Sequence, residues 1–111
     1  MDRELVMYTR KSFCPFVSIA KRVLAKYEIA YREIIIDGDS EAEQRVRGWT
    51  GYRSVPTIVI ARPGEDLPYE PPAELPGGKS PRGIDRGTMI TEPSATQLEA
   101  WLRAKGFINE A

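Results

Sequence analysis

The sequence predicts an α/β fold with one mixed four-stranded sheet and three helices, in the order β-α-β-α-β-β-α. Short apolar runs rich in β-branched residues alternate with longer segments whose apolar residues recur at helical spacing. The second run contains the unbroken triplet III at residues 34–36, which is typical of a strand buried on both faces of a parallel sheet. The first two strands, joined by a helix, should be parallel with a right-handed crossover. The last two should be antiparallel neighbours.

The first half of the chain gives two strands and one helix. Residues 5–9 (LVMYT) form the first strand, and residues 30–37 (AYREIIID) form the second. A helix should begin at Pro15, because proline suits the first helical position, where its missing N–H would lack an intrahelical partner anyway. Its expected apolar face consists of Phe16, Ile19, Ala20, Val23, Leu24 and Tyr27.

The second half begins with a helix near Ser40, where Ser40 and Glu43 have the form of a capping box and Gly51 ends the helix. The apolar stripe of this helix is Ala42, Val46 and Trp49. Strands follow at residues 56–61 (PTIVIA) and, more weakly, at 87–91 (GTMIT).

The last helix should start with a second capping box, formed by Ser94 and Gln97. Its core-facing residues are expected to be Leu98, Trp101 and Leu102. Gly106 fits the position just past the helix end, with Phe107 folding back as its hydrophobic contact.

A long loop separates the third and fourth strands. Residues 62–86 hold six of the nine prolines of the chain. A loop of this length inside a small domain is functional or mobile, and it replaces what is usually a tight hairpin. We expect residues 1–111 to form one domain that contains this loop as an insertion.

Composition excludes several classes of function. Lys+Arg and Asp+Glu number 16 each, so the charge balance gives no reason to expect nucleic acid or a membrane surface as partner. The absence of histidine rules out Ser-His and Cys-His pairs and histidine-rich zinc sites. We expect no signal peptide, because the N-terminus is acidic from residue 2 and has no long apolar stretch. A single cysteine cannot form an intrachain disulfide and fits a cytoplasmic, reducing setting.

That cysteine, Cys14, lies between a strand and a helix in the stretch YTRKSFCPFV. An unreactive cysteine buried for packing is one interpretation. The other is a reactive thiolate, favoured by the start of a helix and by the charges of Arg10 and Lys11. On this second interpretation we expect Cys14 to be partly exposed, since it occupies a strand-to-helix turn.

The pattern resembles the glutaredoxin branch of the thioredoxin-like fold. The residues that carry the resemblance are Lys11, Cys14-Pro15 followed by the aromatic Phe16, and Val55-Pro56 opening the third strand. The resemblance implies that Cys14 is the nucleophile and that Pro56 is a cis-proline beside it. It also implies that Val55 offers its backbone to an extended substrate, as an added strand does.

The remaining site residues come from the same resemblance. Lys11 and Arg53 would contact carboxylates of glutathione, and Phe16 would flank it. Because Val17 stands where a second cysteine is common in the family, only a monothiol route is open. The implied activity is thiol–disulfide exchange with glutathione mixed disulfides, with glutathione as co-substrate and no tightly bound cofactor or metal. The implied partners are glutathione, or another small thiol, and disulfide-bonded or glutathionylated proteins, for a monomeric protein.

Two alternatives belong to other classes. In an iron–sulfur cluster carrier, two protomers would each give Cys14 and glutathione would complete the ligation. Such family members commonly have Gly after the cysteine and Ser two positions later, where this chain has Pro15 and Val17. In a non-catalytic binding module of thioredoxin fold, residues 62–86 would supply the interface, and Cys14→Ser would leave partner binding intact.

Overall fold

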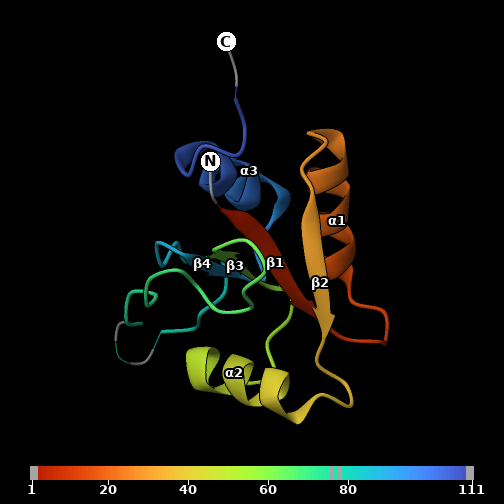
Figure 1. Cartoon of the computed structure of the whole chain (residues 1–111), viewed down its shortest axis with the longest axis vertical. Helices are drawn as coiled ribbons and strands as arrows, with labels where there is room; N and C mark the ends of the chain where they lie inside the picture. Colours follow the sequence, from red (N-terminus) through yellow and green to blue (C-terminus); the bar gives the residue numbers. More distant parts are fainter. Residues whose placement is uncertain (1–2, 76, 78, 110–111) are drawn as a thin grey trace.

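The elements follow the predicted order. The computed structural model describes residues 3–75, 77 and 79–109. Its elements are β1 (Glu4–Thr9), α1 (Pro15–Lys26), β2 (Tyr31–Ile35), α2 (Ser40–Thr50), β3 (Thr57–Ala61), β4 (Met89–Thr91) and α3 (Ala95–Ala104). The four strands lie in the order β2-β1-β3-β4 (Figure 1). As predicted, β1 pairs with β2 in parallel, and β3 pairs with β4 antiparallel.

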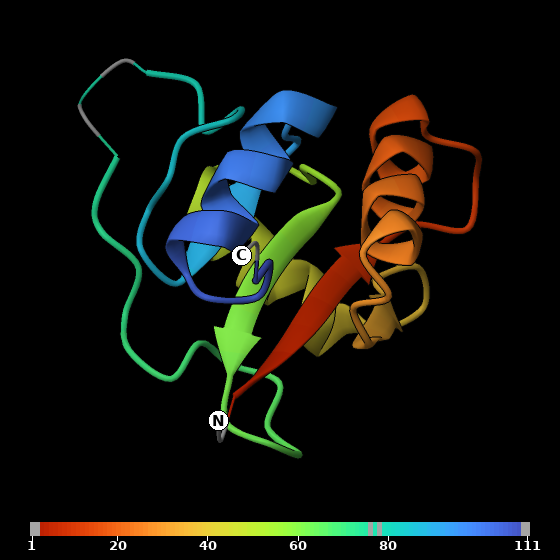
Figure 2. The same cartoon turned by 90° about the horizontal axis from the view of Figure 1, so that it is seen from above.

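The sheet has a hydrophobic core on each face. Helices α1 and α3 cover one face and α2 covers the other (Figures 1 and 2). Alternating residues of β1 explain this division, since Leu5 and Met7 belong to the α1/α3 core whereas Val6 and Tyr8 belong to the α2 core. The first core is completed mainly by Ala20, Val23, Leu24, Ile58, Ile60, Ile90, Leu98, Trp101 and Leu102. The sheet is thus held rigidly between two helical layers.

The prediction that the triplet 34–36 is buried on both faces is wrong. β2 pairs only with β1 and forms an edge of the sheet. Ile34 is half-buried, Ile35 is 42% exposed, and only Ile36, which lies beyond the strand, is buried. An apolar run shows that a strand is hydrophobic. Whether its side chains are buried on both faces depends on the position of the strand in the sheet.

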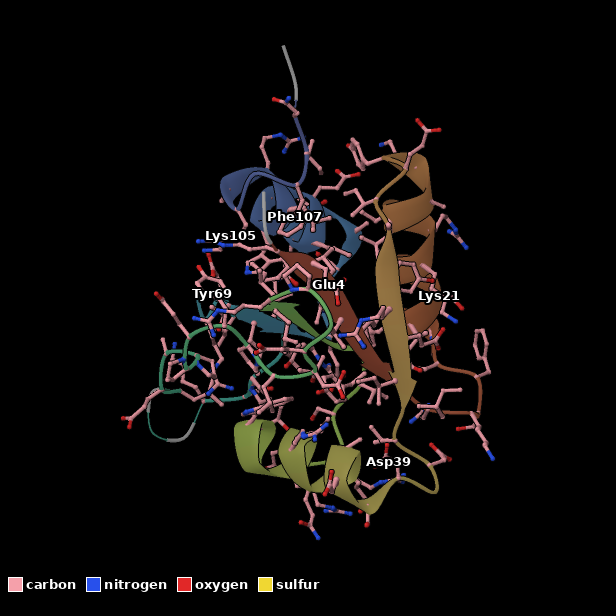
Figure 3. The ribbon with its side chains drawn as sticks, viewed as in Figure 1. Glu4, Lys21, Asp39, Tyr69, Lys105 and Phe107 are labelled. Atoms are coloured by element: carbon pink, nitrogen blue, oxygen red, sulfur yellow. The ribbon has the colours of Figure 1, made fainter. Side chains whose placement is uncertain are left out.

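Helix ends follow local side-chain chemistry, with one correction. The cap of α2 is Asp39, whose carboxylate accepts a hydrogen bond from the Ala42 backbone at 3.1 Å, and not the predicted Ser40–Glu43 box (Figure 3). Gly51 ends α2 as predicted, in the left-handed conformation with φ 82°. None of the helices in the described ranges is long and apolar enough to cross a membrane.

The last helix begins and ends as predicted. The capping box of Ser94 and Gln97 is present at the start of α3. At its end Gly106 has φ 85°, and the Phe107 backbone N–H donates to the Leu102 carbonyl at 2.8 Å. Phe107 folds back against the α1/α3 core (Figure 3). This arrangement is a Schellman motif, in which glycine allows the turn without steric cost.

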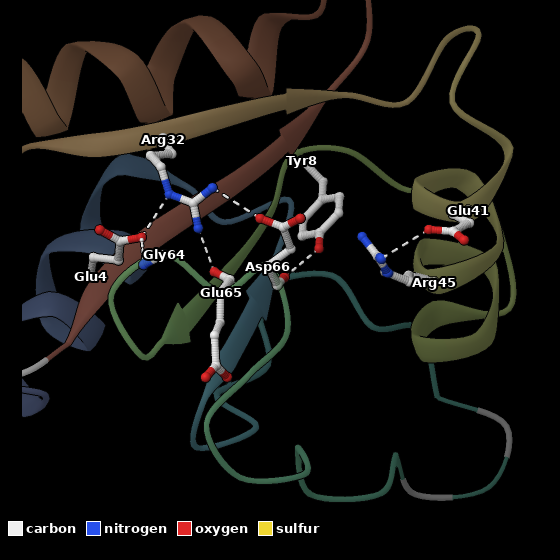
Figure 4. Close-up of polar contacts among 8 residues, drawn as sticks. All are labelled: Glu4, Tyr8, Arg32, Glu41, Arg45, Gly64, Glu65 and Asp66. Carbon is white, nitrogen blue, oxygen red and sulfur yellow. Dashed lines mark hydrogen bonds and ion pairs between the residues drawn. The ribbon is translucent and has the colours of Figure 1, made fainter.

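The long loop is attached to the body at several points. It passes along the β4 side of the sheet (Figures 1 and 2). Near its start, Arg32 of β2 forms ion pairs with Glu4 at 2.6 Å and with Asp66 at 2.9 Å (Figure 4). The Tyr8 hydroxyl donates to the Asp66 carbonyl, and Glu4 accepts from the Gly64 backbone. The first part of the loop is therefore tied to the β1–β2 edge by charged hydrogen bonds.

Near its end, the loop is tied to α2 by Arg86, which is only 7% exposed. The guanidinium donates to the Ala73 carbonyl at 2.7 Å and to the Trp49 carbonyl at 2.5 Å. Trp49 lies in the last turn of α2, where carbonyl groups have no intrahelical partner. Burial lowers the pKa of Arg86 below its usual range. A buried cation of the loop thus caps the C-terminal end of a helix, where the helix dipole is negative.

Candidate active site

Cys14 lies at the N-terminal end of α1, on the α1/α3 side of the sheet. It is the N-cap residue of α1, and Pro15 is the first residue of the helix, as predicted. The Cys14 side chain caps no backbone group, and the first turn of α1 contains no acidic residue. The partial positive charge of the helix N-terminus is therefore not neutralised by a side chain of the first turn.

The expected partial exposure of Cys14 is wrong. Cys14 is only 7% exposed, and its sulfur lies 3.7 Å from the Val55 carbonyl oxygen, to which the thiol donates. The cause is the loop before β3, which brings Val55 against the start of α1. This contact could not be read from the local sequence, because 41 positions separate the two residues.

The loop before β3 is fixed by its neighbours. The Val55–Pro56 peptide bond is cis, as the resemblance predicts. The Thr57 hydroxyl donates to the Ser54 carbonyl at 2.8 Å and lies 3.1 Å from the Thr91 hydroxyl. From the other side, the Glu92 backbone donates to the Pro56 carbonyl at 2.8 Å. Each contact involves a buried or half-buried group, so the backbone of residues 54–57 is held in one position beside the sulfur.

Lys11 and Arg53 come together through one acidic residue. The Lys11 backbone N–H donates to the Asp37 carboxylate at 3.3 Å, and Arg53 lies 3.9 Å from the same oxygen. Arg53 also pairs with Glu43 at 3.2 Å. A hydrogen bond from Arg47, with the charge of Arg53 beside it, lowers the pKa of Glu43. Much of the Arg53 charge is thus neutralised, whereas the Lys11 side chain has no ion-pair partner within the described ranges.

Phe16 lies in the first turn of α1, two residues after Cys14. It is half-buried, and the guanidinium carbon of Arg82 lies 5.1 Å from its ring centroid. Two other aromatic side chains are largely exposed: Phe13, the residue before Cys14, at 76% and Tyr52, three residues before Val55, at 66%. The site surface therefore combines a covered thiol with exposed aromatic and cationic groups.

The six predicted site residues gather around the start of α1 and the loop before β3. Cys14, Val55 and Pro56 form its centre, Phe16 lies on the helix beside it, and Lys11 and Arg53 meet at Asp37. Sequence reasoning missed Asp37, Glu43 and Arg82 as members of this group. Arg82 lies in the long loop, and no local pattern relates it to residues so far away in the chain.

A surface cavity at the C-terminal end of α2 does not include this group. It has a volume of about 620 Å³, and its lining residues are Thr50, Gly51, Tyr52, Lys79 and Ser80. None of the six predicted site residues lines it. This cavity and the residues around Cys14 are therefore separate, and the candidate active site consists of the residues around Cys14.

The comparisons with known proteins agree with the geometry. The family model for glutaredoxin matches residues 5–62, which include the strand, the cysteine and the cis-proline loop. A chloroplastic glutaredoxin-C4 of Oryza sativa subsp. japonica is 34% identical over 58 residues, covering 50% of this chain and 44% of that protein. A glutaredoxin of Solanum lycopersicum is 33% identical over 55 residues, covering 47% and 51%. The chain spans about half the length of the curated relatives that it matches.

A solved structure extends the likeness of fold beyond residue 62. A structural-genomics target protein of X. campestris covers 90% of this chain and 96% of its own, with a TM-score of 0.51 and 24% sequence identity. At that identity the match concerns the fold alone. Because the family model covers more than half of the 111 residues, the chain belongs to the glutaredoxin family and has its thioredoxin-like fold.

Proposed function

We propose that this chain is a monothiol thiol–disulfide oxidoreductase that acts on glutathione mixed disulfides. One observation carries the proposal: the only cysteine of the chain occupies the N-cap position of α1 and contacts the cis-proline loop. Family membership supports disulfide chemistry in general. The lack of a second cysteine supports a route in which glutathione, and not a neighbouring thiol, releases the product.

The reaction is a pair of exchanges at one sulfur. The Cys14 thiolate attacks the glutathione sulfur of a protein–glutathione disulfide, a new bond forms between the two sulfurs, and the substrate protein leaves as a thiolate that takes up a proton. A second glutathione thiolate then attacks the glutathionyl sulfur and expels Cys14. The sum converts the mixed disulfide and one glutathione into the protein thiol and glutathione disulfide, so atoms and electrons balance without another cofactor.

The surrounding residues have roles in binding in this proposal. The backbone of Val55, next to Pro56, pairs with the extended substrate, which replaces the thiol contact at its carbonyl. Lys11, whose side chain has no ion-pair partner in the described part of the chain, binds a carboxylate. Arg53 does so less strongly, because Asp37 and Glu43 already hold it. Phe16 packs against the substrate beside the sulfur.

The test is intact-mass spectrometry of the reduced protein mixed with a glutathionylated peptide and then with excess glutathione. We expect one glutathionyl group to appear on Cys14 and to disappear after glutathione is added, with release of the reduced peptide. Cys14→Ser is the matched control and should show neither step. If the wild-type thiol stays unmodified while an unrelated glutathionylated-peptide reductase reacts in the same mixture, the proposed function is wrong.

A further inference from the structure

Arg82 comes from the long loop but lies at the thiol site. Its guanidinium is over the Phe16 ring, and its Nη2 is 3.1 Å from the Glu92 carboxylate. Glu92 in turn donates its backbone N–H to the carbonyl of Pro56, the residue after the one that contacts the Cys14 sulfur. Three contacts, Arg82 to Glu92, Glu92 to Pro56, and the adjoining Val55 to Cys14, thus connect this cation of the loop to the proposed nucleophile.

The backbone around Arg82 is built into the body of the protein. Arg82 is bridged to Thr91, and the Gly83 backbone donates to the Thr91 carbonyl at 2.7 Å. Gly83 has φ 73°, and a Cβ atom there would lie 2.4 Å from the Gln97 amide oxygen. Glycine suits this position because its φ is left-handed, and a side chain there would also displace the Gln97 amide from the start of α3. Glu92 itself has φ 45°, a conformation that a residue with a side chain rarely adopts.

The Arg82–Glu92 pair presents its positive end to solvent. The Arg82 side chain is 61% exposed, whereas the Glu92 side chain is 17% exposed. A guanidinium has five N–H donors in a planar fork, and the contact with Glu92 involves one terminal nitrogen. Donors therefore remain for a second carboxylate, which Arg binds in bidentate geometry. The carboxylate of Glu92 holds the cation in place without covering it.

We propose that Arg82 is a specificity-determining residue, which makes Cys14 prefer disulfides that carry a carboxylate near the reacting sulfur over neutral or cationic disulfides. This inference rests on the function proposed above and adds a substrate class to it. The reaction is the same exchange: the Cys14 thiolate bonds to one sulfur of the probe, the disulfide breaks, and the other half leaves as a thiolate. Arg82 contacts the carboxylate and takes no part in the bond changes.

The experiment compares three symmetric disulfides: dithiodipropionate, which is anionic, bis(2-hydroxyethyl) disulfide, which is neutral, and cystamine, which is cationic. The rate of adduct formation on Cys14 is measured by intact mass for the wild type, Arg82→Gln and Arg62→Gln. Arg62 is an exposed arginine of the same loop at the far end of β3, so its variant controls for net charge. Comparing ratios between variants cancels the intrinsic reactivity of each probe.

We expect Arg82→Gln to lower the anionic-to-neutral rate ratio about 2- to 5-fold, as fits one exposed charge contact. Arg62→Gln should leave the ratio within experimental error. The preference should also shrink as salt is raised, because the contact is exposed. An unchanged ratio in Arg82→Gln, or an equal loss in Arg62→Gln, overturns the role of Arg82. If no probe forms an adduct with the wild type, the proposed function itself fails, and the role of Arg82 fails with it.

Discussion

Val17 lies one helical turn after Cys14 and is buried at 8% exposure. A cysteine placed there would face the Cys14 sulfur, because residues three apart on a helix are neighbours. We expect Val17→Cys to convert the single-cysteine route into an intramolecular one. After reaction with a glutathionylated peptide, intact mass should show a protein lighter by two hydrogens and free glutathione, in place of a stable glutathionyl adduct.

The matched control is Arg22→Cys, which adds an exposed thiol eight residues after Cys14, about 12 Å further along the helix and out of reach of its sulfur. It should keep the glutathionyl adduct of the wild type. A persistent adduct in Val17→Cys would show that the two sulfurs do not meet and would contradict the geometry of the α1 start given above.

The site residues that could be predicted from the sequence are those with a local signature. Cys14 before Pro15 marks a helix start, and Val55-Pro56 marks the opening of a strand. The burial of Cys14 and the contact of Arg82 with Phe16 could not be predicted, because both depend on contacts between segments that are distant in the chain. A local pattern specifies the backbone of a turn but not what packs over it.

At the scale of the elements, the C-terminal end of α1 carries avoidable strain. Glu28 has φ 55°, and the Ile29 backbone donates to the Leu24 carbonyl at 2.9 Å, so Glu28 occupies the position that usually holds glycine. We expect Glu28→Gly to raise the free energy of unfolding by about 0.5 to 1 kcal/mol. Glycine removes the strain of the left-handed conformation, but it also gives the unfolded chain more conformational entropy, which offsets part of the gain. Denaturant unfolding measures this difference.

Gly51 gives the reverse control, since it already has φ 82° at the end of α2. Gly51→Ala should lower the free energy of unfolding by about 1 to 2 kcal/mol for the same reason. Equal or lower stability of Glu28→Gly would mean that contacts of the Glu28 side chain outweigh the backbone strain.

Element type and order were predictable because each helix and strand carries its own hydrophobic period, whereas two details were not. The predicted cap of α2 was Ser40, whereas the observed cap is Asp39. Both side chains can accept the capping hydrogen bond, and Asp39 is the residue whose backbone is extended, as an N-cap requires. The exposure of Ile35 reflects the edge position of β2, which is a property of the sheet and not of the strand.

At the scale of the whole molecule, Arg86 joins the long loop to α2. Replacing it with methionine removes a buried charge but leaves the carbonyls of Ala73 and Trp49 without their donor. Since each buried group left unpaired costs about 1 to 3 kcal/mol, we expect Arg86→Met to destabilise the protein by a similar amount overall. Limited proteolysis should then cut within residues 62–86 more rapidly.

Arg62→Met is the control, because Arg62 is an exposed residue of the same loop. It should change stability by less than about 0.5 kcal/mol and leave the cleavage rate unchanged. Unchanged proteolysis in Arg86→Met would show that the loop is held without this contact.

The other anchor of the loop should respond to acid. The Gly64 backbone N–H, and then Arg32, hold the pKa of Glu4 below its usual value of 4.5. A carboxylate with a lowered pKa in the folded state stabilises the structure above its unfolded value, and this contribution is lost as the pH falls through the folded value. We expect the Gly64 amide NMR signal to titrate with a midpoint below 4.5.

In Glu4→Gln the Gly64 signal should stay constant over the same range, because the acceptor remains but no longer titrates. A wild-type midpoint at or above 4.5 would contradict the hydrogen-bonded anchor. Neither anchor of the loop could be predicted from the sequence, since both join residues that lie far apart in the chain.

The two tryptophans lie on opposite faces of the sheet, which gives the protein two separate optical reporters. Trp101 is 2% exposed in the α1/α3 core, and its indole N–H has no acceptor within the described part of the chain. Trp49 packs on the α2 side, edge-on to Tyr8 with ring centroids 5.3 Å apart. Fluorescence of Trp101→Phe therefore follows α2 and the loop that Arg86 attaches to it. Fluorescence of Trp49→Phe follows the layer that begins with Cys14.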